Sequence, residues 1–155
     1  MMRLGLFLIA IFGIPCLLTA QADLEMQVDV VYLASDYLEG RETGTSGEER
    51  APDYIISRFR EMGLQPAGQN GTFVQPFAFN FNPNPHGGEG EAEQREGKNV
   101  LAYLDNGAEK TVIIGAHYDH LGKGLFGSRY FGPPMIHNGA DDNASGVAAM
   151  LWLAR

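Results

Sequence analysis

The chain has 155 residues, a formal net charge of −8 and 45% hydrophobic residues. This length fits one domain. The acidic balance and the lack of any lysine or arginine cluster exclude the basic surface that nucleic acids and anionic membranes require, so we expect neither as a partner.

Residues 1–22 have the pattern of a secretory signal peptide. Arg3 precedes an apolar run over Leu4–Leu18, and small residues lead to a cleavage site after Ala22. The run is shorter than the ~20 residues that span a bilayer, although an uncleaved anchor is the alternative. We therefore expect a secreted or periplasmic protein without membrane attachment after cleavage. Its only cysteine, Cys16, would leave with the signal, so any metal must be held by His, Asp or Glu.

Two helices are predicted at the start of the mature chain. Apolar residues recur near helical spacing over Leu24–Leu38, and Gly40 follows as a C-terminal cap. Ser46 can cap a second helix, and Glu49 three residues later completes a capping-box pattern. We expect this second helix to stop at Gly63.

The next part of the chain predicts strands and polar loops. Thr72–Phe81 is predicted to be an edge strand, because Pro76 cannot donate to a central ladder. Residues 82–97 have no apolar period and predict an exposed loop. Asn99–Leu104 predicts a strand, and the continuous apolar run Thr111–Ala116 predicts a strand buried on both faces. Strands followed by a helix indicate an α/β layer fold.

The last twelve residues, Ala144–Arg155, predict a buried helix without a residue that ends it. Such an end leaves apolar surface uncovered and carbonyls without partners. We therefore expect residues 23–155 to be the N-terminal portion of an incomplete domain.

The segment Gly115–His120 places metal-ligand side chains directly after the predicted buried strand. His117 and Asp119 lie two apart, so in an extended segment they share a face. An imidazole that binds zinc through one nitrogen usually donates from the other to a carboxylate or carbonyl. Asp119 could orient His117 in this way. The alternative is that the two side chains only bond each other.

The segment Asn138–Gly146 contains two adjacent carboxylates, Asp141 and Asp142, before a helix start. Unpaired, they would repel each other, and a bound dication removes that cost. Their simpler interpretation is a helix N-terminus, where acids are favoured anyway.

Two further histidines lie near these segments. His120 and His137 could line a cleft, although each could equally be a solvated loop histidine. The aromatic and glycine-containing stretch Leu121–Asn138 could form one wall of that cleft. His86 lies in the predicted loop and is given no role.

Together, His117-Tyr118-Asp119 and the segment Gly139–Gly146 resemble the zinc exopeptidases of the aminopeptidase Y and bacterial leucyl aminopeptidase family. The resemblance extends from about Val28 to Arg155 and includes the stretch Leu33–Arg41. It implies an α/β fold with a mixed sheet flanked by helices, the zinc-dependent exopeptidase (phosphorylase/hydrolase-like) fold, truncated at its C-terminus.

The resemblance also implies roles for individual residues. The family holds two zinc ions joined by a carboxylate and a water. His117 would bind one zinc, Asp142 would bridge both, and Asp119 would orient His117. The Asp142–Asn143 peptide would be cis. We expect His117 and Asp142 to converge on one cation cluster, whereas the general-base glutamate and the remaining ligands are not in this chain.

The expected function is that of an exported zinc metallopeptidase, an aminopeptidase in class, which hydrolyses terminal peptide bonds of a peptide substrate with a metal-bridging water. Because the catalytic glutamate pair is missing, we expect the chain alone to have no more than trace activity. One alternative is a mono-zinc enzyme resembling the glutaminyl cyclases. The other is a non-catalytic binding relative, like the transferrin receptor ectodomain. The sequence leaves side-chain preference, amino or carboxyl terminus, and oligomeric state open.

Overall fold

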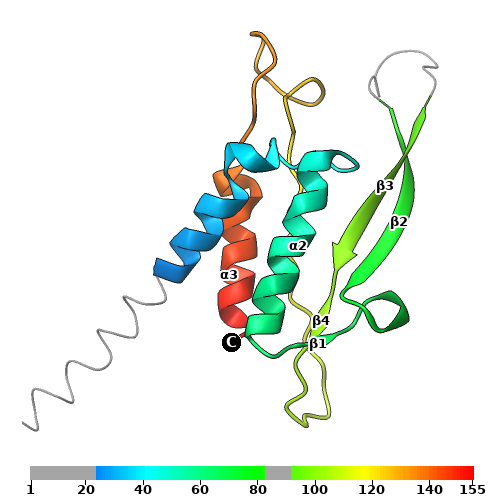
Figure 1. Ribbon diagram of the computed structural model, residues 1–155, viewed down its shortest axis with the longest axis vertical. Coiled ribbons are helices and arrows are strands. Elements are labelled where there is room, and N and C mark those ends of the chain that lie inside the picture. The colour runs from blue at the N-terminus through cyan, green and yellow to red at the C-terminus, as the bar shows by residue number, and fades with distance from the viewer. Residues whose placement is uncertain (1–23, 83–91) are drawn as a thin grey trace, which may run out of the picture.

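A computed structural model describes residues 24–82 and 92–155 of the chain. The predicted signal peptide and residues 83–91 of the predicted loop, including His86, lie outside the described residues. In the described part, helices stand side by side and an antiparallel ribbon lies next to α2 (Figure 1). The loops that carry the two motifs gather at one end of this arrangement, and the chain's C-terminus lies at the other.

The first helix is shorter than predicted. It covers residues 24–33, and a separate 3-10 turn, η1 (Asp36–Leu38), follows it. Left-handed backbone at Glu39 (φ +47°) and Gly40 (φ +75°) then reverses the chain, so Gly40 ends the turn and not the helix.

Helix α2 spans Ser46–Glu61 and confirms the second predicted helix, and Gly63 follows it with φ +72°. The predicted capping box is wrong. The N-cap residue is Thr45, which makes no side-chain cap hydrogen bond, and the Ser46 hydroxyl donates instead to the Glu39 carboxylate at 3.1 Å. The η1 turn brings this carboxylate to the start of α2, where acids are favoured, and Ser46 lies inside the helix and not at its N-cap.

Two small antiparallel sheets are present in the described residues. Strand β2 (Val74–Phe81) pairs with β3 (Glu93–Val100), and β1 (Gln65–Pro66) pairs with β4 (Ala102–Tyr103). Because β2 has one partner, it is an edge strand as its proline predicted. Helices with these sheets are compatible with the α/β class, but the expected mixed sheet is not seen in the described ranges.

The structure corrects the boundaries of the next predicted strand. β3 begins at Glu93, inside the predicted loop, and the predicted strand Asn99–Leu104 is divided between β3 and β4. The ladder with β2 stabilises β3, whose outer residues are charged and mostly exposed. Such a strand carries no apolar alternation to predict it.

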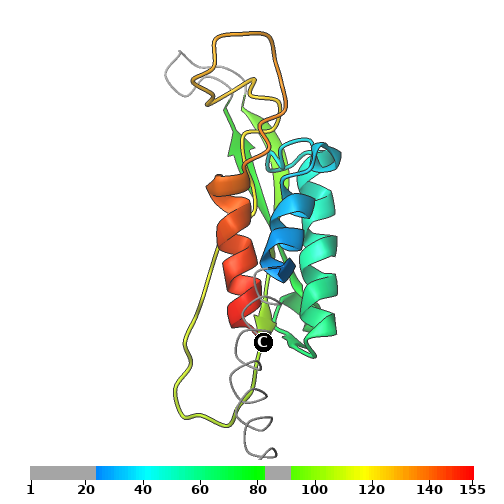
Figure 2. The ribbon, with the colours of Figure 1, turned by 90° about the vertical axis from the view of Figure 1, so that its left-hand side faces the viewer.

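The prediction of a buried strand over Thr111–Ala116 is wrong for this chain. The run is extended but pairs with no described strand, and Val112 and Ile113 are 82% and 91% exposed. In Figure 2 the segment that leaves β4 follows the outside of the molecule. Only Ala116, at the end of the run, packs against the described core, so the apolar pattern alone could not bury the rest.

Helix α3 (Ser145–Leu153) follows a π turn, η3 (Ala140–Ala144), and agrees in part with the predicted buried helix. Its inner face is buried, whereas Trp152 and Leu153 are 45% and 57% exposed. The core lies between the helices and is formed by buried side chains that include Leu33, Leu38, Ile55, Phe59, Val147 and Leu151. Each such side chain contributes about 1.5–3 kcal/mol by leaving water.

Within residues 24–82 and 92–155, no helix is both long enough and apolar enough to cross a bilayer.

Candidate metal centre

The two motif segments meet at the N-terminal end of α3 (Figure 1). The segment His117–His120 has no regular secondary structure, and Asp142 lies in η3, directly before α3. A hydrogen bond from the Asn143 side-chain amide to the His117 carbonyl, at 3.2 Å, joins them. The fold therefore places His117 and Asp142 side by side at the protein surface.

His117 is held between two carboxylates. Its Nδ1 lies 3.2 Å from both the carbonyl oxygen and Oδ1 of Asp119, and its Nε2 lies 3.2 Å from Oδ1 of Asp142. The Thr43 hydroxyl donates to the second oxygen of Asp119 at 3.1 Å. Asp119 is thus where an orienting partner of His117 would be, and the opposite ring nitrogen faces Asp142.

Asp142 presents its two carboxylate oxygens to two histidines. Oδ1 faces His117, and Oδ2 lies 3.7 Å from Nδ1 of His120. Burial lowers the pKa of His120, while the negative charge of Asp142 acts in the opposite direction. The peptide bond Asp142–Asn143 is cis, as the resemblance implied.

The donor set of this pair fits zinc. When Asp119 holds the proton on Nδ1 of His117, Nε2 is an acceptor that faces a second acceptor on Asp142. A cation between the two atoms relieves that conflict. Two ligand atoms on one tetrahedral zinc, at the usual bond lengths, lie about 3.3–3.5 Å apart, close to the separation seen here. Both side chains are more than half exposed, so the position is open to solvent.

Two other predicted site residues lie apart from this pair. Asp141 is exposed, and its carbonyl accepts a hydrogen bond from the Ser145 hydroxyl at 2.9 Å. His137 has its Nε2 3.1 Å from the Ser128 hydroxyl, and its ring centre lies 6.4 Å from that of His120. Across the described ranges, no group of three or more His, Cys, Asp or Glu side chains could by itself hold an ion.

A buried arginine behind the motifs was not singled out in the sequence. The side chain of Arg41 is fully buried, and its guanidinium donates to the backbone carbonyls of Leu33, Tyr118, Asn138 and Gly139. Burial lowers the pKa of Arg41, and the carboxylates of Asp119 and Asp142 oppose that effect. Its position in a polar, loop-like stretch hid it, and its place in the Leu33–Arg41 part of the resemblance was the one available signal.

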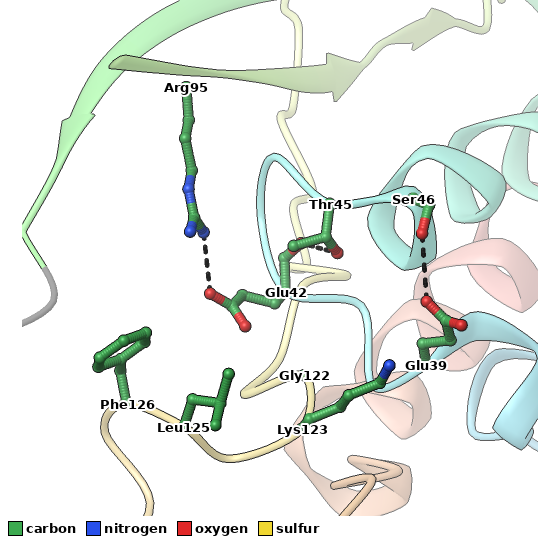
Figure 3. Close-up of a pocket in the computed structure, with 9 residues that line it drawn as sticks. All are labelled: Glu39, Glu42, Thr45, Ser46, Arg95, Gly122, Lys123, Leu125 and Phe126. Carbon is green, nitrogen blue, oxygen red and sulfur yellow. Dashed lines mark hydrogen bonds and ion pairs between the residues drawn. The ribbon is translucent and has the colours of Figure 1, made fainter. Parts of the chain in front are cut away.

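A pocket of about 290 Å³ lies next to the loop that follows His120 (Figure 3). Its walls come from the 39–46 segment, β3 and the 122–126 loop. Arg95 donates to Glu42 at 2.9 Å on one side, and Leu125 and Phe126 form an apolar side. Part of the stretch that was predicted to form a cleft wall therefore lines this pocket.

The sequence model of peptidase family M28 matches residues 99–155, which contain both motifs and α3. This part of the chain, 57 of its 155 residues, is similar to peptidase family M28. No curated protein matches it. The similarity to the M28 family points to a peptidase, a hydrolase of peptide bonds, and M28 peptidases are generally zinc-dependent.

Proposed function

We propose that this chain carries part of the metal centre of an exported zinc aminopeptidase, which releases residues from the free end of a peptide. The proposal depends on one observation: Nε2 of His117 and Oδ1 of Asp142 lie 3.2 Å apart, with Asp119 on the other ring nitrogen. This arrangement lies within the residues that match the family.

In this proposal His117 and Asp142 hold zinc, and Asp119 fixes the ring of His117 through Nδ1. Since a carboxylate has two oxygens, Asp142 could serve two ions. Zinc, when bound, would polarise the scissile carbonyl and activate water. Two side chains are fewer than the ligands of known zinc sites, so the proposal includes further ligands and a general base beyond these motifs.

The pocket lined by the 122–126 loop is the proposed place for the substrate's side chain. Leu125 and Phe126 offer an apolar surface, while two acidic and two basic side chains of the lining balance in charge: Glu39, Glu42, Arg95 and Lys123. An apolar substrate side chain would be favoured there because it loses contact with water. Export is proposed on the signal-like pattern of residues 1–22 alone.

Zinc binding by the full 155-residue chain tests the metal part of the proposal. We expect His117→Ala and Asp142→Ala to weaken zinc binding at least tenfold in a chelator-competition titration. His137→Ala is the matched control, because His137 contacts Ser128 and not Asp142. Wild-type affinity in the His117→Ala variant would refute the proposed centre.

Amino-acid release and metal content test the enzyme class. We expect the chain alone to release at most trace amounts of amino acid from a peptide in the presence of zinc. For the complete peptidase, two bound zinc ions per molecule are expected. One ion would favour a cyclase-like enzyme, and none would favour a binding relative.

A further inference from the structure

Arg41 makes an unusual set of contacts for a buried cation. Its Nε donates to the Tyr118 carbonyl at 2.6 Å, and its terminal nitrogens donate to the carbonyls of Asn138 (2.8 Å), Gly139 (2.9 Å) and Leu33. All four contacts are to main-chain oxygens, and these oxygens belong to three separate segments. A planar guanidinium with five donors in a fixed fork can hold such a set, whereas an ammonium cannot.

Three of the four acceptor residues lie in the motifs, next to the candidate ligands. Tyr118 lies between His117 and Asp119, and Asn138 and Gly139 lead directly into the η3 turn that carries Asp142. The backbone of Arg41 adds a further tie, because its carbonyl accepts from the His120 N–H at 3.0 Å. One residue therefore fixes both segments relative to each other.

The positive charge of Arg41 interacts with carboxylates of the two motifs. Both carboxylates whose charge acts on it, Asp119 and Asp142, belong to the candidate metal centre. No carboxylate is among its hydrogen-bond acceptors. The guanidinium is thus hydrogen-bonded to the backbone of both motifs. Its positive charge also interacts with the two carboxylates of the candidate metal centre.

We propose that Arg41 is the positioning residue of the metal centre, which sets the separation of His117 from Asp142 by holding the main chain of both motifs. This inference rests on the proposed zinc centre. By thermodynamic reciprocity, if Arg41 favours zinc binding, bound zinc must stabilise the hydrogen bonds of Arg41 by the same factor.

The first test compares zinc affinity in Arg41→Lys and Arg58→Lys variants of the full chain. Arg58 is a matched control because it also ties buried parts together, with Nε 3.0 Å from Asp29, but it lies on α2 away from both motifs. At a temperature where both variants are folded, Arg41→Lys should bind zinc at least tenfold more weakly, and Arg58→Lys should bind it like the wild type even if it melts earlier. Affinity of Arg41→Lys within twofold of the wild type would overturn the inference.

The second test needs no variant, so it decides the question if Arg41→Lys does not fold. In the wild-type chain, exchange of the Arg41 Nε–H with solvent, followed by NMR, should slow at least tenfold when zinc is added. An unchanged exchange rate, with zinc bound, would overturn the inference. If His117→Ala weakens zinc binding but Arg41→Lys does not, only this inference is contradicted. If the wild-type chain binds no zinc, the proposed metal centre is contradicted as well.

Discussion

The phenol of Tyr118 lies 2.6 Å from the carboxylate of Glu48, which is 2% exposed. The neighbours of Tyr118 are largely exposed, with the side chains of His117 and Asp119 at 57% and 47%. The phenol also lies within hydrogen-bonding reach of the Lys98 carbonyl on β3. One three-residue segment therefore joins the interior of the protein to the candidate metal centre.

We predict that Tyr118→Phe lowers the free energy of unfolding by about 1–3 kcal/mol, because the buried Glu48 carboxylate loses its hydrogen-bond donor. Urea unfolding measures this. Tyr130→Phe, at an exposed position, is the control and should change stability little. In a Glu48→Gln background the effect of Tyr118→Phe should shrink, and full additivity would argue against the contact.

The same contact predicts a dependence on alkaline pH. Burial, and then the hydrogen bond with Glu48, raises the pKa of Tyr118 in the folded protein. An unfolded tyrosine titrates near pH 10. The contribution of Tyr118 is therefore complete below about pH 10 and is lost as the pH rises towards its folded pKa. Above pH 10 the wild type should lose stability more steeply than Tyr118→Phe, and equal slopes would contradict the assignment.

Asp119→Asn should weaken zinc binding by about 10- to 100-fold, the usual effect of losing the partner that orients a ligand histidine. The amide keeps the size of the side chain, and the Thr43 hydroxyl can still bond to it, so the fold should be unchanged. Asp105→Asn is the control, because Asp105 only accepts the Gly107 N–H in a turn. Zinc competition measures both, and equal affinities would remove Asp119 from the centre.

Gly139→Ala should damage the centre beyond its effect on the backbone. Gly139 has φ +59°, and a Cβ there would lie 2.5 Å from the Asp142 carbonyl oxygen and 2.6 Å from the His120 ring. Gly107→Ala is a matched control with φ +72° and no atom within 4 Å. Both changes should cost about 1–2 kcal/mol of stability for the left-handed backbone. Only Gly139→Ala should lose more than this and also weaken zinc binding, as calorimetry and zinc titration would measure.

Ile113→Lys should reduce self-association without loss of stability. Ile113 is 91% exposed within an exposed apolar run, the kind of surface that promotes aggregation. Surface substitutions usually change stability by no more than about 0.5 kcal/mol. By contrast, Ile55→Ala should cost about 2–5 kcal/mol, because Ile55 is 2% exposed in the core. Light scattering and thermal unfolding measure the two effects, and a strongly destabilised Ile113→Lys would mean that this run is covered.

The sequence was a good guide wherever local chemistry decides the structure. Helix α2 ends at Glu61, two residues before the glycine that was predicted to stop it, and the edge position of β2 follows from its proline. The convergence of His117 and Asp142 was also expected, although their role as ligands stays a prediction.

The sequence-based predictions failed where contacts between distant parts of the chain determine the structure. Strand β3 is stabilised by its hydrogen-bonded ladder with β2. Its residues are mostly polar or charged, so its sequence has no apolar alternation that would predict a strand. The run Thr111–Ala116 has the composition of a buried strand but no described neighbour to pair with. Arg41 acts on main-chain oxygens from three segments, and no side-chain pattern reports such contacts.

The side chain of Arg41 donates its hydrogen bonds to main-chain oxygens, so these bonds do not depend on which side chains the acceptor residues carry. Positions 33, 118 and 138 are restricted by other contacts: Leu33 lies in the core, the Tyr118 phenol bonds to Glu48, and the Asn138 side-chain amide donates to the Ala34 carbonyl. The same residues thus serve twice: their carbonyls bond to Arg41, and their side chains connect the candidate metal centre to the core and to the 34–36 turn.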